Sequence, residues 1–209
     1  MSAAPRPVHS VIPAAAPGAD DALRIADEQD TRQFIARVFA NHYNARVDTF
    51  CNQLMAQRDK EGRILAAAGY NLAEEGPLFL EQYLGVPVEE FVKDKLGLDL
   101  TRSDLVEVGN LATVEAGGAR QLIAMMTRHL HKLGQRWVVF TATRQLINSF
   151  QRMGLSPIPL QQATPDRVRN PENWGRYYDQ QPWVVLGNIG QGFAHLENLA
   201  SLTPPELLQ

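Results

Sequence analysis

The sequence predicts a single α/β domain in which helices flank a central sheet. Short strand-forming segments alternate along the chain with amphipathic helical segments, and this alternation is typical of α/β folds. Hydrophobic residues make up 44% of the 209 residues and charged residues 21%, as in ordinary globular proteins. Because a chain of this length can bury a substantial core, we expect one domain over residues 20–200.

The first half of the chain predicts a strand, a helix, a hairpin, a second helix and a long strand. Phe34, Ile35, Val38 and Phe39 repeat with helical spacing, and a polar turn ending in Gly62 separates two strand-like segments. Pro87 and Gly97 are typical of the start and the end of a helix. The expected strands are Leu23–Ala26, Gln53–Arg58, Arg63–Leu72 and Leu105–Val114, and the expected helices are Thr31–Tyr43 and Val88–Leu96.

The second half continues the alternation of strands and helices. Apolar residues from Ala119 to Leu133 lie on one helical face, and Gly134 ends that helix. A further helix runs from about Leu146 to Met153 and is closed by Gly154. The expected strands are Trp137–Thr143, Ser156–Gln161 and Pro182–Ile189, with a long polar and aromatic insertion over Thr164–Gln181.

The two ends of the chain differ from the domain in composition. Residues 1–19 are rich in Ala and Pro, and we expect a flexible leader there. Pro13 and Pro17 interrupt its only apolar stretch, which argues against a secretory signal. We therefore expect a cytoplasmic protein with a short tail over residues 201–209.

Charge and cysteine content exclude several classes of function. The formal net charge is −3, whereas a nucleic-acid-binding domain is usually basic. A single cysteine excludes an internal disulfide and a cysteine-rich metal framework, and no metal site is expected. No apolar run approaches the length of about 20 residues that a membrane-spanning helix needs. These observations favour small-molecule chemistry, with no nucleic acid and no membrane span.

A glycine-rich junction between a strand and a helix is the first candidate site. Glycines allow close approach of a ligand to the backbone, and the free N–H groups at the start of a helix bind anions. A plain turn is the alternative explanation. The residues expected to bind a pyrophosphate are Val114, Gly117, Gly118, Ala119, Arg120 and Gln121.

Polar residues within apolar segments form the second candidate site. Glu107 and Asn110 interrupt an apolar strand, and Glu81 interrupts an apolar, aromatic segment. A carboxylate is rarely buried without a partner or a role in acid/base chemistry. Simple alternation would instead turn Glu107 toward solvent, and the same alternative holds for Glu81.

The aromatic insertion is the third candidate, because long aromatic loops often bind ligands. Trp174, Tyr177 and Tyr178 would either contact a substrate or anchor the insertion to the sheet. Cys51, next to Phe50, is predicted to be a small buried hydrophobic residue rather than a nucleophile.

The order of these elements resembles the GNAT acyltransferase fold, a mixed and mostly antiparallel sheet flanked by helices. Residues 114–119 match the glycine half of the motif Arg/Gln-x-x-Gly-x-Gly/Ala that surrounds the acyl-CoA turn, and they lack its leading Arg or Gln. Many GNAT enzymes carry a tyrosine general acid at the position of Phe150, which has no proton to give.

Four sequence blocks are similar to the thermostable hemolysin family, which is related to GNAT enzymes and acyl-homoserine-lactone synthases. The resemblance implies acyl transfer from acyl-CoA or acyl carrier protein to a small-molecule acceptor, with no tightly bound cofactor. Glu107 would then be the general base, Glu81 the second choice, and Thr141, Thr143 and Asn148 would position the substrate. The blocks are Leu78–Leu84, Val106–Ala112, Val139–Thr143 and Trp174–Tyr178.

Two other functions stay open at this point. The family name suggests a membrane-active haemolysin-type protein, although no basic amphipathic helix or long alternating strand pair is evident. Phe150 is also compatible with a non-catalytic protein that binds acyl thioesters. The sequence does not indicate an oligomeric state.

Overall fold

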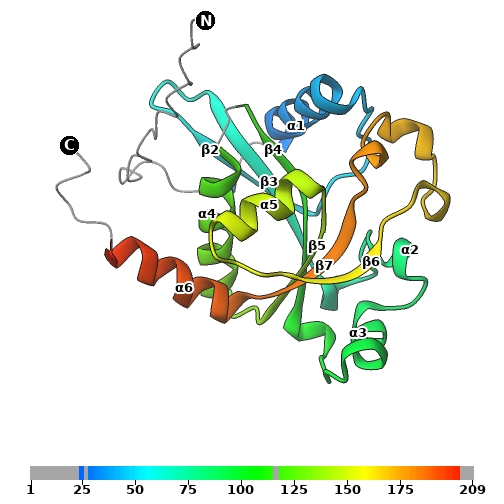
Figure 1. The fold of residues 1–209 in the computed structure, drawn as a ribbon. Coiled ribbons are helices and arrows are strands. Elements are labelled where there is room, and N and C mark those ends of the chain that lie inside the picture. The colour runs from blue at the N-terminus through cyan, green and yellow to red at the C-terminus, as the bar shows by residue number, and fades with distance from the viewer. Residues whose placement is uncertain (1–23, 26–27, 115–117, 203–209) are drawn as a thin grey trace, which may run out of the picture.

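One sheet organises the part of the chain that the structure describes. The computed structural model describes residues 24–25, 28–114 and 118–202 (Figure 1). Within these ranges seven strands pair in the order β1-β2-β3-β4-β5-β7-β6, and only β4 and β5 run parallel to each other. The expected mixed, mostly antiparallel sheet is therefore confirmed. The strands are β1 (Arg24–Ile25), β2 (Gln53–Arg58), β3 (Ile64–Leu72), β4 (Leu105–Thr113), β5 (Trp137–Ala142), β6 (Ile158–Gln162) and β7 (Trp183–Asn188).

Helices cover both faces of the sheet (Figure 1). The apolar side chains of α1 pack against β2, β3 and β4 on one face, where those of α2 and α3 also pack against β4 to β7. The apolar side chains of α4 and α5 pack against the opposite face, and α6 lies against α4. The helices are α1 (Glu28–Tyr43), α2 (Glu81–Leu84), α3 (Val88–Leu96), α4 (Gly118–Lys132), α5 (Arg144–Arg152) and α6 (Ile189–Leu202).

Most expected elements are present within a few residues of their expected bounds. The first strand is seen as β1, while Leu23 and Ala26 lie outside the described residues. Thr143 does not continue β5, because its side chain accepts a hydrogen bond from the Leu146 N–H and begins α5. The insertion at 164–181 consists of three short 3₁₀ turns. α6 is an element that the sequence did not predict, and it extends to Leu202 within the expected tail.

The sheet opens between β4 and β5. These parallel strands pair from Leu105 with Trp137 to Val108 with Phe140, and the pairing ends there although both strands continue. A bulge in β4 accompanies the opening: Asn110 has a φ of 54°, and the register with β3 shifts at this point. Bulges bend a strand and redirect its side chains, so the gap follows from local backbone geometry.

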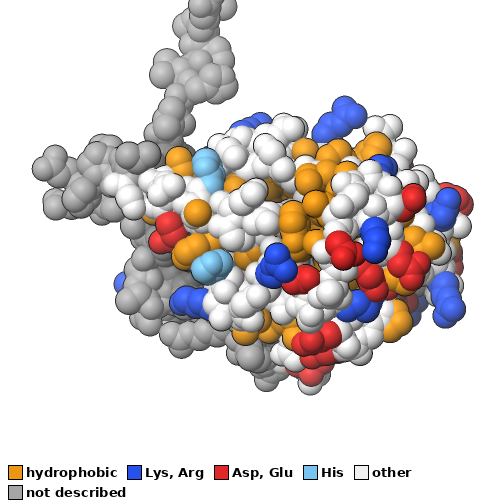
Figure 2. All heavy atoms as spheres, turned by 90° about the horizontal axis from the view of Figure 1, so that it is seen from below, with side chains coloured by type: hydrophobic (Ala, Val, Ile, Leu, Met, Phe, Trp, Pro, Cys, Tyr) orange, Lys and Arg blue, Asp and Glu red, His pale blue; other side chains and the backbone are white. Residues whose placement is uncertain are grey.

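The surface carries charges of both signs. On the face shown in Figure 2, basic and acidic side chains are intermingled, and hydrophobic side chains gather between them. Within the described residues, no helix combines the length and the hydrophobicity that crossing a membrane requires.

Candidate functional site

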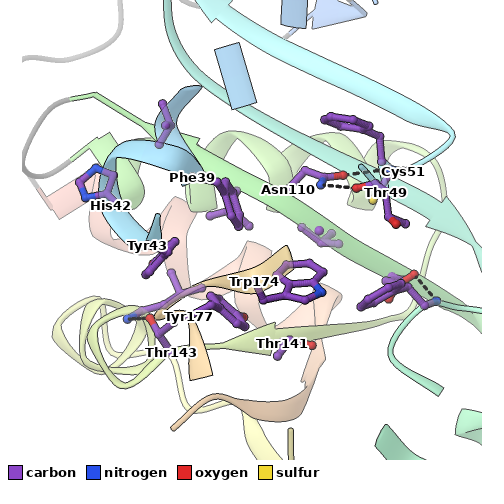
Figure 3. A pocket seen from close by; sticks show the side chains of 18 of the residues that line it. Phe39, His42, Tyr43, Thr49, Cys51, Asn110, Thr141, Thr143, Trp174 and Tyr177 are labelled. Atoms are coloured by element: carbon purple, nitrogen blue, oxygen red, sulfur yellow. Dashed lines mark hydrogen bonds between the residues drawn. The ribbon is translucent and has the colours of Figure 1, made fainter. Parts of the chain in front are cut away.

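The opening between β4 and β5 leads into a cavity of about 240 Å³ (Figure 3). Its walls come from the C-terminal end of α1, the segment before β2, the bulged part of β4, the end of β5, the start of α5 and the aromatic insertion. Gly109 to Leu111 of β4 and Thr141 of β5 face each other across the gap as lining residues. The cavity therefore lies where the two parallel strands stop pairing.

Aromatic rings from separate parts of the chain form one wall of the cavity. Tyr43 at the end of α1 meets Tyr177 edge to face, with ring centroids 5.3 Å apart. Trp174 lies 5.5 Å from the Tyr177 ring and 5.7 Å from the Phe79 ring. Figure 3 shows the rings of Phe39, Tyr43, Trp174 and Tyr177 around the same space. The insertion thus brings Trp174 and Tyr177 to the cavity instead of only covering the sheet.

Backbone hydrogen bonds hold the insertion against the end of α1. The Arg176 N–H donates to the Tyr43 carbonyl at 2.7 Å, and the Arg46 N–H donates to the Asn173 carbonyl at 2.6 Å. Asn173 also donates through Nδ2 to the Asp48 carboxylate at 2.9 Å. These bonds fix Trp174 between two anchored neighbours.

Glu107 is the acidic residue of the cavity wall, and only 4% of its surface is exposed. Oε2 accepts hydrogen bonds from Asn71 Nδ2 and the Phe79 N–H, both at 3.0 Å, and Oε1 accepts one from the Leu80 N–H at 2.9 Å. Burial raises the pKa of this carboxyl, and the three hydrogen bonds oppose the rise. The alternation that would turn Glu107 toward solvent does not apply, because α2 and its preceding segment cover this face.

Asn110 connects the bulge to the segment before β2. Its Oδ1 accepts the Cys51 N–H at 2.8 Å, and its Nδ2 donates to the Thr49 carbonyl at 3.2 Å (Figure 3). An asparagine tolerates positive φ better than most residues, which explains its place at the bulge. Cys51 is buried, as expected, and burial raises the pKa of its thiol, so the sulfur is poorly suited to act as a nucleophile.

A second cavity of about 310 Å³ lies on the other face of the sheet, among α4, α5, α6 and the strands. Its lining is mainly apolar and includes Met126, Phe140 and Phe150. Val108 and Leu111 line both cavities, so the two spaces share a wall beside the opening between β4 and β5.

The predicted anion site lies at the end of β4. α4 begins at Gly118, Ala119 lines the first cavity, and Arg120 is exposed in the first turn of the helix. Val114 is 53% exposed, and Gly117 lies outside the described residues. The start of a fifteen-residue helix therefore borders the cavity, with a cationic side chain next to it.

The structure brings seven of the predicted residues together at the first cavity. Gly117 lies outside the described residues, and the others do not line the cavity, among them Val114, Gly118, Arg120 and Gln121 of the predicted anion site. Glu107, Asn110, Ala119, Thr141, Thr143, Trp174 and Tyr177 all line the first cavity. Glu81 does not: its carboxylate accepts the N–H groups of Leu78 and Val88 and pairs with Arg102 at 2.7 Å. Asn148 is exposed on α5 and lines neither cavity, and Tyr178 lies behind the wall, with its hydroxyl 2.9 Å from that of Tyr83.

Sequence reasoning missed the contribution of α1 and of the segment that follows it. Phe39, His42, Tyr43, Thr49 and Phe50 line the cavity, although they resemble an ordinary amphipathic helix and a polar loop in the sequence. Residues 42–50 do contain a useful signal, because aromatic and polar residues follow the end of a helix there. The sequence does not show which other segments these residues contact.

Comparisons with known proteins agree on fold and family. TofI in an apo form superimposes with a TM-score of 0.56 at 17% identity, over 90% of this chain and 96% of that chain. FeeM, an N-acyl amino acid synthase from uncultured soil microbes, gives 0.55 at 12% identity, over 83% and 98%. BjaI, a CoA-dependent acyl-homoserine lactone synthase with SAM and isopentyl-CoA, gives 0.54 at 14% identity, over 83% and 82%.

These likenesses confirm the expected GNAT-like fold. No curated protein sequence matches the chain significantly. The family model described as "Thermostable hemolysin" matches residues 24–193, which is most of the chain, and the chain therefore belongs to the thermostable hemolysin family.

Proposed function

We propose that this protein is an acyltransferase that moves an acyl group from a thioester donor to a small-molecule acceptor. The observation that carries the proposal is the opening between β4 and β5, where a polar and aromatic cavity and an apolar one share Val108 and Leu111 as lining residues. Acyl-CoA and acyl carrier protein remain the two candidate donors, because both present the same pantetheine thioester.

The donor would enter along the unpaired side of β4. Backbone groups of residues 109–113 on that side have no strand partner among the described residues, so they are available to hydrogen-bond the amides of a pantetheine arm. The pyrophosphate of CoA would lie at the start of α4, between Val114 and Gln121, with Arg120 adding positive charge.

The acyl chain would pass through the opening into the apolar second cavity. Val108 and Leu111 belong to both cavities, so the thioester carbon would lie between them while the chain packs against Met126 and Phe140. Burial of each methylene contributes about 0.8 kcal/mol. This favours a donor with a longer chain than acetyl.

The acceptor would occupy the aromatic part of the first cavity, beside Glu107. Glu107 takes a proton from the acceptor nucleophile, directly or through a water, as the nucleophile attacks the thioester carbon. The C–S bond breaks, and the proton passes on to the leaving thiolate. Holding donor and acceptor side by side supplies the proximity gain. Thr141 and Thr143 would orient the reacting groups.

Two measurements test the proposal. Thermal unfolding with a series of acyl-CoAs and acyl carrier proteins should show stabilisation that grows with chain length when all donors are at the same concentration. A donor present at 100 times its Kd should raise the free energy of unfolding by about 2.7 kcal/mol. A thiol-reactive dye should then report release of the free thiol when an acceptor is present. Matched free fatty acids serve as controls. Absence of stabilisation by every donor would contradict the proposal, and binding without thiol release would favour a non-catalytic binder.

A further inference from the structure

The charge distribution of the first cavity bears on the kind of acceptor that it takes. Among the described residues that line the cavity, Glu107 is the only acidic one, and none is Lys or Arg. His42 lies at the rim, at the exposed end of α1. A carboxylate or phosphate beside Glu107 would meet one negative charge and no Lys or Arg among the described lining residues, and an unpaired buried anion is strongly disfavoured.

Counting donors from the described part of the chain, Glu107 keeps an unused acceptor position. A carboxylate offers about four lone-pair positions, and here Oε2 accepts two hydrogen bonds whereas Oε1 accepts one. The remaining position on Oε1 suits an N–H donor. The rings of Phe79, Trp174 and Tyr177 supply apolar surface and the negative faces that attract an ammonium group.

Resting on the proposed function, we infer that the acceptor is a small primary amine with an apolar or aromatic body and no anionic group. Its nitrogen donates to Glu107, and its body lies against Trp174 and Tyr177. The bound ammonium first releases one proton to solvent, which gives the neutral amine. In the transfer the N–C bond then forms, the C–S bond breaks, and one proton of the amine passes through Glu107 to the thiolate. The products are an N-substituted amide and a free thiol.

Arg169 is the cationic side chain that tests this inference most directly. It lines a separate surface cleft together with Asp48, and that cleft shares Thr49, Phe79 and Trp174 with the cavity. If the acceptor carried a carboxylate, Arg169 could hold it only from across this shared wall. Substitution of Arg169 therefore distinguishes the two kinds of acceptor.

Matched pairs of acceptors provide the experiment. Phenethylamine and tyramine are compared at pH 8 with phenylalanine and tyrosine, which differ from them by a carboxylate. The donor is the acyl-CoA that stabilises the protein most. Thiol release gives kcat/KM, and calorimetry in the presence of CoA gives binding. We expect each amine to exceed its amino acid by about tenfold or more in both measurements.

Variants of this protein test whether charge in the cavity determines the choice of acceptor. Glu107→Gln should reduce amine binding, whereas Glu172→Gln, the same change at an exposed position of the insertion, should not. His42→Arg should place a cation at the rim and raise the kcat/KM of the amino acid relative to the amine. Because His42 is exposed, this variant keeps the test independent of the buried Glu107 network.

Three outcomes would overturn the inference. They are equal or better use of the amino acids, a loss of amino-acid use in Arg169→Gln, and failure of both amines to bind. Binding of the amines without thiol release would uphold the acceptor class and contradict the acyltransferase proposal, so the two failures are distinguishable.

Discussion

Gly175 determines whether the aromatic insertion can dock against α1. It has a φ of 52° and a ψ of −122°, a conformation that L residues rarely adopt. A Cβ at this position would overlap the carbonyl oxygen of Tyr43 and lie 2.5 Å from that of Asn44. Both contacts are with backbone, so no side chain can rotate to make room. Gly175→Ala must therefore move the insertion away from the helix.

The cost of this substitution follows from two contributions. Backbone strain accounts for about 1–3 kcal/mol. Displacing the insertion also breaks the Arg176–Tyr43 and Arg46–Asn173 hydrogen bonds, worth about 0.5–1.5 kcal/mol each. The free energy of unfolding should therefore fall by about 2–6 kcal/mol. For a domain of this size each kcal/mol lowers Tm by about 2–4 °C.

Gly62→Ala is the matched control. Gly62 has a φ of 81°, and nothing lies within 4 Å of the position of its Cβ, so only strain of about 1–2 kcal/mol is expected. Differential scanning calorimetry gives both values of Tm, and near-UV circular dichroism reports the packing of the aromatic cluster. The reasoning fails if Gly175→Ala lowers Tm no more than Gly62→Ala and leaves the near-UV spectrum unchanged.

Three further predictions concern the two cavities. Glu107→Gln should lower kcat by about 10²-fold or more, whereas Glu81→Gln should chiefly lower stability, by about 1–3 kcal/mol, because it weakens the pairing with Arg102; an equal loss of kcat in both variants would contradict these roles. Because burial raises the pKa of Glu107, the folded protein binds this proton more tightly than the unfolded chain, so stability relative to Glu107→Gln should fall as pH rises from about 4.3 through the raised pKa, while kcat/KM rises there. Urea titrations and rate profiles over pH check both trends, and a flat difference would refute them. Gly192→Leu should fill the second cavity, since a Cβ there lies 3.7 Å from Thr127, and each excluded methylene removes about 0.8 kcal/mol of donor binding. Long-chain donors should lose kcat/KM while short-chain donors keep it, with Gly192→Ala as the control; equal losses would place the chain elsewhere.

The sequence was sufficient for elements whose pattern is local. The helix containing Phe34 to Phe39 and the hairpin closed at Gly62 follow from periodicity and turn chemistry, and both are present. α6 was missed because Gly190 and Gly192 lower helix propensity near its start and the apolar spacing is weak. The packing of α6 against α4 is a tertiary contact, which a local sequence pattern does not reveal.

The site was only partly predictable, because its residues depend on tertiary partners. Glu81 and Glu107 look alike in the sequence, since each interrupts an apolar segment. Both glutamates accept backbone N–H groups, but Glu81 also pairs with Arg102 whereas Asn71 binds Glu107, and neither of these side chains is near its glutamate in the chain. The φ of Asn110, which opens the sheet, is likewise a property of the packed bulge.

The short paired stretch between β4 and β5, called the seam below, also connects the two halves of the sheet. Four residue pairs, from Leu105–Trp137 to Val108–Phe140, join the block β1–β4 to the block β5–β7–β6 by strand pairing. Amide hydrogens on the open side of residues 109–113 should exchange with solvent far faster than those along the seam. A bound pantetheine arm would act as a short additional strand and slow that exchange. The donor thioester would then be a structural component of the sheet as well as a substrate.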